Sequence, residues 1–215
     1  MDKDTQQTVP YALKELARLL GTHVKNRRLD IPEEFGKGYC AGFVFDEHIR
    51  MFIFNYELKE DLIIENPDID VPMRMILFKF QNIFPETEGS STSKQGKAAP
   101  SVLIATRRMN ADVVIPIHTN TATINIEVDA TYLNGLFDLS EKSPVLQGLL
   151  QNTQPLLFEQ LMFPSLQKIV DEIVHEPVDE AFELFFQRVN RSSHNCYLLR
   201  EMLQYVPPCY PARKL

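Results

Sequence analysis

The periodicity of the sequence changes once along the chain, and this change limits the folds that the chain can adopt. Residues 38–128 form short runs of β-branched and aromatic side chains between turn residues, a pattern typical of β-strands. Residues 129–205 instead repeat apolar side chains every three or four positions, which predicts helices. Strands followed by helices indicate an α+β fold rather than an alternating α/β fold.

The strand region divides into seven predicted strands. Their ranges are 39–45, 49–56, 57–64, 71–80, 101–107, 112–118 and 121–128. In the last of them, apolar and polar residues alternate: the apolar ones are Ala122, Ile124, Ile126 and Val128, and the polar ones are Thr121, Thr123, Asn125 and Glu127. This alternation predicts a strand with one buried and one solvated face.

Helices are predicted where a capping residue or a proline precedes an apolar repeat. A short helix covers residues 11–20, and later helices begin at Asp129, Ser143-Pro144, Pro164 and Pro177. The last helix ends near Tyr205, because prolines follow it at once.

Composition excludes several classes of protein. The net charge of −7 and the isoelectric point near 5.3 argue against nucleic-acid binding by this chain alone. The three cysteines are far apart and form no CxxC pair, which favours reduced thiols. The chain has no secretory signal pattern and no apolar run long enough to span a bilayer, so we expect a cytoplasmic protein without membrane contact.

No sequence motif indicates a catalytic centre, a metal site or a cofactor site. The five histidines are scattered along the chain and form no HxH or HExxH pair. Gly96-Lys97 is followed by Ala98, so the hydroxyl that a phosphate-binding loop places on magnesium is missing. We therefore expect no catalytic residue, no metal and no cofactor.

Polar and aromatic side chains on the predicted strands are candidates for a ligand site. They are His48, Arg50, Phe52, Phe54, Tyr56 and Arg74. Because successive strand residues point to opposite faces, Arg50 and Tyr56 share a face with Phe52 and Phe54. If that face points inward, its few polar groups would orient a ligand in an apolar surrounding. The alternative is an outer, solvated face.

The C-terminal helical segment carries an apolar seam with the spacing of a coiled coil. Its candidate dimer-interface residues are Val178, Phe182, Phe185, Val189, Leu199 and Leu203. A stripe of this kind pairs two copies of the chain or packs on residues 155–174 of its own chain, and both possibilities remain open.

Several segments together resemble the N-terminal domain of AraC-family transcriptional regulators. They are residues 38–43, 49–56, 58–62, 124–129 and the phenylalanine-rich helix at 182–203. The resemblance implies an antiparallel cupin-like β-roll or barrel that senses a small-molecule effector, followed by a C-terminal helical bundle through which two copies pair as a homodimer. It further implies that DNA is bound only by helix-turn-helix motifs further on, which residues 1–215 lack.

The resemblance divides the chain into three parts. Residues 1–128 would form the N-terminal helix and the roll, residues 129–205 the helical dimerisation region packed on the roll, and residues 206–215 a tail or linker. Two other functions remain open: a small cupin-like enzyme acting on a metabolite, and a ligand-free interaction module. In the module, Phe52, Phe54, Phe78 and Phe80 would fill the inner strand faces.

Overall fold

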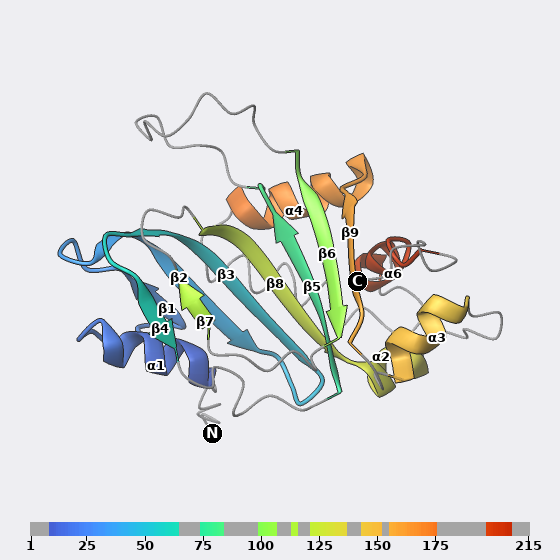
Figure 1. Ribbon diagram of the computed structural model, residues 1–215, viewed down its shortest axis with the longest axis horizontal. Coiled ribbons are helices and arrows are strands. Elements are labelled where there is room, and N and C mark those ends of the chain that lie inside the picture. The colour runs from blue at the N-terminus through green and yellow to red at the C-terminus, as the bar shows by residue number, and fades with distance from the viewer. Residues whose placement is uncertain are drawn as a thin grey trace, which may run out of the picture.

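The large antiparallel sheet dominates the fold, which is α+β as the sequence predicts (Figure 1). The structure, a computed structural model, describes residues 9–64, 74–83, 99–106, 113–115, 121–136, 143–151, 155–175 and 197–207. The sheet has seven strands in the order β1-β2-β3-β8-β5-β6-β9, and every neighbouring pair is antiparallel. Their bounds are β1 Arg28–Asp30, β2 Gly36–Val44, β3 Ile49–Leu58, β8 Thr121–Asp129, β5 Met75–Gln81, β6 Ser101–Thr106 and β9 Leu157–Leu161. Within the described residues this sheet is open and does not close into a barrel.

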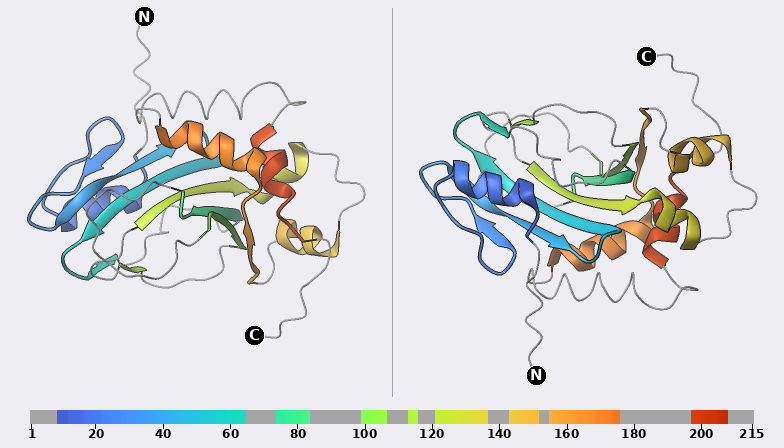
Figure 2. Two further views of the ribbon diagram at one scale, coloured as in Figure 1. Left: turned by 90° about the horizontal axis from the view of Figure 1, so that it is seen from above. Right: turned by 90° about the horizontal axis from the view of Figure 1, so that it is seen from below.

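Further elements cover both faces of the large sheet. A two-stranded ribbon pairs β4 (Leu62–Ile64) with β7 (Val113–Ile115). The described helices are α1 Tyr11–Leu19, α2 Ala130–Leu136, α3 Pro144–Gln151, α4 Pro164–His175 and α6 Tyr197–Leu203. Figure 2 shows α4 along one face of the sheet, and α1 with the β4-β7 ribbon on the other face.

The face of the sheet beneath α4 is the main hydrophobic core. Strand alternation directs Phe78, Phe80, Ile124 and Ile126 to this face, where all four are buried. Helices α2, α3, α4 and α6 contribute buried aliphatic residues to the same cluster. The helical region and the sheet therefore share one core, because neither could bury its apolar face alone.

A second hydrophobic cluster lies under α1 at the other end of the sheet. Leu13, Leu16 and Ala17 of α1 are buried there together with Cys40 and Tyr56. Strand alternation places Cys40 and Tyr56 on the face opposite the main core, since their neighbours Ala41 and Ile53 belong to that core. The helix α1 therefore covers one end of the second face.

The helix starts predicted from the sequence are confirmed wherever the structure describes them. The Asp129 carboxylate accepts the backbone N–H groups of Thr131 (2.7 Å) and Tyr132 (2.9 Å) at the start of α2. The Ser143 hydroxyl accepts the Leu146 N–H at 3.2 Å, and α3 begins at Pro144. Helix α4 begins at Pro164. The predicted start at Pro177 lies outside the described residues.

The prediction that residues 129–205 are all helical is wrong at β9. Leu157–Leu161 form an edge strand that pairs with β6, from Ser101↔Leu161 to Ala105↔Leu157. The prediction of a single strand over 57–64 is also wrong, since β3 runs on to Leu58 and β4 begins only at Leu62. Both errors concern strands whose ends are set by pairing with distant segments rather than by local pattern.

Candidate functional site

The sheet face opposite the main core carries a group of polar and aromatic side chains. Register and alternation place these on adjacent strands, and we call them the polar face: Arg50, Phe52, Phe54, Tyr56, Lys79, Gln81, Ser101, Thr121, Thr123, Asn125 and Glu127. One row across the sheet pairs Phe52 with Asn125 and Asn125 with Lys79. In the rows beside it, Arg50 pairs with Glu127 and Thr123 with Gln81.

Strand β8 is the centre of the polar face, and its polar residues are not solvated as the alternation predicted. Thr123 is only 7% exposed and Glu127 only 6% exposed. Both residues lie in the middle of the sheet, between β3 and β5, where water has little access. The face therefore has buried polar residues at its centre and partly buried ones around them, which is uncommon for a surface with only a structural role.

Aromatic rings run along β3 on this face. The rings of Phe52 and Phe54 are nearly parallel, with centroids 5.8 Å apart and an interplanar angle of 4°. Phe54 meets Tyr56 edge to face at 6.2 Å. Successive rings on one side of a strand form a flat apolar wall beside the polar residues of β8.

Burial changes the ionisation of two groups on the polar face. Desolvation raises the pKa of the Tyr56 hydroxyl well above its ordinary value, although a side-chain hydrogen bond with Thr121 opposes the shift. Desolvation lowers the pKa of the Lys79 ammonium. Lys79 is partly buried and takes part in none of the ion pairs Arg18–Glu15, Arg28–Asp30, Lys37–Glu57 and His48–Glu47.

Two buried oxygens of the polar face lack a hydrogen-bond partner among the described residues. They are the Thr123 hydroxyl oxygen Oγ1 and the Asn125 amide oxygen Oδ1. Toward the edge of the sheet, by contrast, Glu159 on β9 accepts hydrogen bonds from Ser101 (3.0 Å) and from Gln81 (3.4 Å). Buried polar groups without partners are rare in folded proteins and occur preferentially at functional sites.

Four of the six predicted ligand-binding residues lie together on the polar face. They are Arg50, Phe52, Phe54 and Tyr56, and Arg50 lies directly opposite Glu127. The quartet of phenylalanines proposed for a filled interior is divided between the two faces. Phe78 and Phe80 belong to the main core, whereas Phe52 and Phe54 lie on the polar face.

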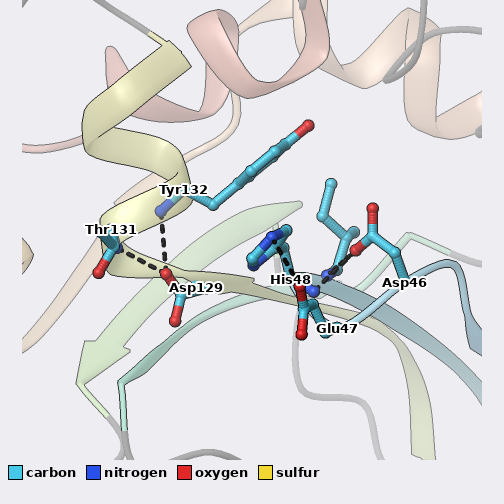
Figure 3. A network of polar contacts seen from close by, with 7 residues as sticks. Asp46, Glu47, His48, Asp129, Thr131 and Tyr132 are labelled. Carbon is cyan, nitrogen blue, oxygen red and sulfur yellow. Dashed lines mark hydrogen bonds and ion pairs between the residues drawn. The ribbon is translucent and has the colours of Figure 1, made fainter.

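The other two predicted ligand-binding residues, His48 and Arg74, flank the start of α2 instead. The backbone carbonyl of His48 accepts the Asp129 N–H at 2.8 Å, and that of Arg74 accepts the Ala130 N–H at 3.0 Å. Figure 3 shows the His48 ring lying flat against Tyr132, with centroids 4.8 Å apart. The Arg74 side chain is exposed.

The Asp46 carboxylate holds the turn before β3 by accepting the backbone N–H groups of His48 (2.7 Å) and Ile49 (2.9 Å). The Nε2 atom of His48 lies 3.5 Å from an oxygen of Glu47. This turn and the Asp129 cap together hold the start of α2 next to the residues that precede β3 and β5 (Figure 3). The role of His48 in the structure is therefore attachment of α2 to the sheet.

The predicted dimer-interface residues are described only at the end of the helical segment. Leu199 is 0% exposed inside the main core, and Leu203 packs against that core. Helix α6 contacts α4 of its own chain. Val178, Phe182, Phe185 and Val189 lie outside the described residues.

Sequence reasoning missed seven residues of the polar face: Lys79, Gln81, Ser101, Thr121, Thr123, Asn125 and Glu127. The alternation of β8 indicated that Thr121, Thr123, Asn125 and Glu127 share a face, but it did not indicate that Thr123 and Glu127 are buried. Lys79 stands between Phe78 and Phe80, whose burial in the main core requires that Lys79 point to the opposite face.

Comparison of the chain with protein-family models, with curated proteins and with solved structures finds no match. Within the described ranges, no group of three or more histidines, cysteines or acidic residues is placed to hold a metal ion. None of the described helices has the length and apolar character required to cross a bilayer.

Proposed function

We propose that this chain is the ligand-sensing and dimerisation domain of an AraC-type transcription regulator. A small-molecule effector binds at the polar face, which forms the interior of a cupin-like roll made by the large sheet and the β4-β7 ribbon. Two copies of the chain pair through C-terminal helices that form a bundle, and a helix-turn-helix domain outside residues 1–215 binds DNA. Ligand sensing, and not catalysis, is the role of residues 1–215.

The single observation that carries this proposal is the buried polar face. Lys79, Thr123 and Asn125 would stabilise the fold more if they were apolar, because desolvating an unpaired polar group costs free energy. A few convergent polar groups beside an aromatic wall are typical of small-molecule sites. The β4-β7 ribbon lies on the same side of the large sheet as this face (Figure 2), which supports a ligand site on that side.

The shared core of sheet and helices supports a sensing mechanism. Helix α2 follows β8 directly, and β8 carries the polar residues of the face. A ligand that contacts Thr123 and Asn125 therefore acts on the strand that leads into the helical region. Such a ligand shifts the arrangement of two copies only if it binds one arrangement more tightly than the other.

Ligand binding is tested with a thermal-shift screen of metabolites on residues 1–215 and on an Asn125→Leu variant. A true effector raises the melting temperature of the parent, and Asn125→Leu abolishes that shift. The matched control is Lys14→Ala, a change at an exposed residue of α1, which leaves the shift unchanged. An effector that stabilises the parent and Asn125→Leu equally would place the ligand elsewhere.

Dimerisation is tested separately by light scattering of the parent and of Phe185→Glu. The proposal expects a dimeric parent and a folded, monomeric variant. A parent that remains monomeric at high concentration contradicts the regulator assignment. A dimer to which no screened metabolite binds would favour the ligand-free interaction module.

A further inference from the structure

Lys79 is the positively charged group of the polar face that no described carboxylate neutralises. Its side chain is partly buried, and its row on the sheet is Phe52, Asn125, Lys79 and Leu103. An unpaired, partly desolvated ammonium is costly, so such a group is normally paired with an anion.

The acidic residues on the same face do not neutralise the Lys79 ammonium. Glu127 lies directly opposite Arg50 on β3 and diagonally from Lys79, and no ion pair joins it to Lys79 among those of the described residues. Glu159 is separated from Lys79 by Leu103 on β6, a gap of about 10 Å for two strand spacings. Glu159 also accepts hydrogen bonds from Ser101 and Gln81. Because Glu159 lies toward the edge of the sheet, Arg50, Glu127 and Lys79 leave one positive charge in excess at the centre of the face.

The groups beside Lys79 can bind the head group of an anion. Thr123 is 7% exposed, shares the face with Lys79, and its hydroxyl has no partner among the described residues. A hydroxyl can donate to a carboxylate oxygen. The Asn125 amide, which is the cross-strand neighbour of Lys79, can hydrogen-bond the same head group.

The groups on the other side of Asn125 are apolar and flat. Phe52 is the cross-strand neighbour of Asn125, and its ring is parallel to that of Phe54. This wall offers an apolar surface to a planar or aliphatic body, while the charged end of the ligand lies over β8 and β5. An amphipathic molecule with one charged end would match both parts of the face.

We infer that the ligand of the polar face is a small organic monoanion with an apolar body, whose carboxylate is bound by Lys79 and Thr123 and whose body packs on Phe52 and Phe54. This inference rests on the proposed function and narrows it to one chemical class. The depressed pKa of Lys79 agrees with a cation that has no anionic partner until a ligand binds.

The test uses three probes with the same ring and different charge: 1-naphthoate, 1-naphthamide and 1-naphthylmethylammonium. Binding to residues 1–215 is followed by fluorescence titration and by thermal shift. A charge-assisted hydrogen bond is worth about a tenfold to hundredfold change in Kd. We expect 1-naphthoate to bind more tightly than the amide by about this factor, and the ammonium probe to bind weakest.

Two variants test the role of Lys79 in this preference. Lys79→Met weakens 1-naphthoate binding about tenfold or more and leaves the amide unaffected, because only the charged head group contacts Lys79. Lys79→Met also raises the melting temperature of the ligand-free chain, which a lysine with only a structural role would not do. Lys79→Gln repeats the test if the methionine variant fails to fold, and Lys14→Met, on the exposed side of α1, is the matched control.

Equal affinity for naphthoate and naphthamide overturns the inference but leaves a ligand-binding domain in place. Unchanged naphthoate binding by Lys79→Met also overturns it. Absence of binding by all three probes rejects an apolar monoanion as the ligand class, whereas the metabolite screen and the light-scattering experiment decide the proposed function independently.

Discussion

The Thr123→Val substitution should stabilise the ligand-free chain. Thr123 is 7% exposed, and its hydroxyl oxygen has no hydrogen-bond partner among the described residues. Valine has nearly the same shape and replaces the hydroxyl with a methyl group. The substitution therefore removes a buried, unsatisfied polar atom without creating a cavity, and β-branched valine is well suited to a strand.

The expected gain follows from the cost of an unsatisfied buried group. That cost is about 1–3 kcal/mol, and we expect roughly 1–2 kcal/mol to be recovered on substitution. For a chain of 215 residues this corresponds to an increase in melting temperature of roughly 2–8 °C. Calorimetry and chemical denaturation of the purified chain measure the two quantities.

Thr106→Val is the matched control for this prediction. Thr106 is 1% exposed and lies on β6, but its hydroxyl oxygen accepts the Leu156 N–H at 2.8 Å. Removing this acceptor leaves a buried donor unsatisfied, which should cost about 1–3 kcal/mol. Opposite signs for the two variants support the reasoning. If Thr123→Val destabilises the chain as Thr106→Val does, the Thr123 hydroxyl has a partner and the polar face is satisfied without a ligand.

Three further predictions follow from other parts of the fold. Leu199→Ala should cost about 3 kcal/mol, or roughly 6–12 °C in melting temperature, because Leu199 is fully buried in the core of its own chain. The loss should not depend on protein concentration, and a loss that disappears at high concentration would instead place Leu199 in a dimer seam. Gly38→Ala should prevent folding or cost more than about 3 kcal/mol, because φ is +98° and an added Cβ would lie 2.1 Å from the Asn55 carbonyl oxygen. Gly21→Ala, with φ of +61° and open space around it, should cost only about 1–2 kcal/mol in the same denaturation assay, and similar losses for both glycines would refute the steric argument. Burial raises the pKa of Cys40 and of Tyr56, so the folded chain retains protons that the unfolded chain releases above their ordinary pKa values of 9.0 and 10.0. The free energy of unfolding should therefore fall as the pH rises beyond about 9. In melting curves measured from pH 8 to 11, Cys40→Ala should flatten the first part of this decline. An unchanged slope in Cys40→Ala would exclude Cys40 as the source of the decline.

Local signals in the sequence were sufficient to predict several helix starts. Asp129, Ser143 and Pro164 each mark a helix start that the structure describes, because a cap involves only the few residues next to it. The β-runs were found for the same reason, since alternation is a property of each strand alone. The exceptions are β1 and β9, short strands that follow no strong local pattern and are held by pairing with β2 and β6 respectively.

The candidate site could be predicted only in part. Alternation along β3 correctly grouped Arg50 with Phe52, Phe54 and Tyr56. It could not bring Lys79 beside Asn125, because that contact depends on β5 and β8 being neighbours although some 40 residues separate them along the chain. It also could not distinguish a buried polar face from a solvated one, since the two have the same pattern of residues.

The sequence by itself therefore determined the α+β class, most strands and the helix starts, because periodicity and capping act within a few residues. Only the tertiary structure decided the strand order, the burial of Thr123 and Glu127, the place of Leu199 in the core of its own chain, and the position of Lys79 without a carboxylate partner among the described residues. These features depend on which distant segments pair and what then excludes water, and no single segment carries that information.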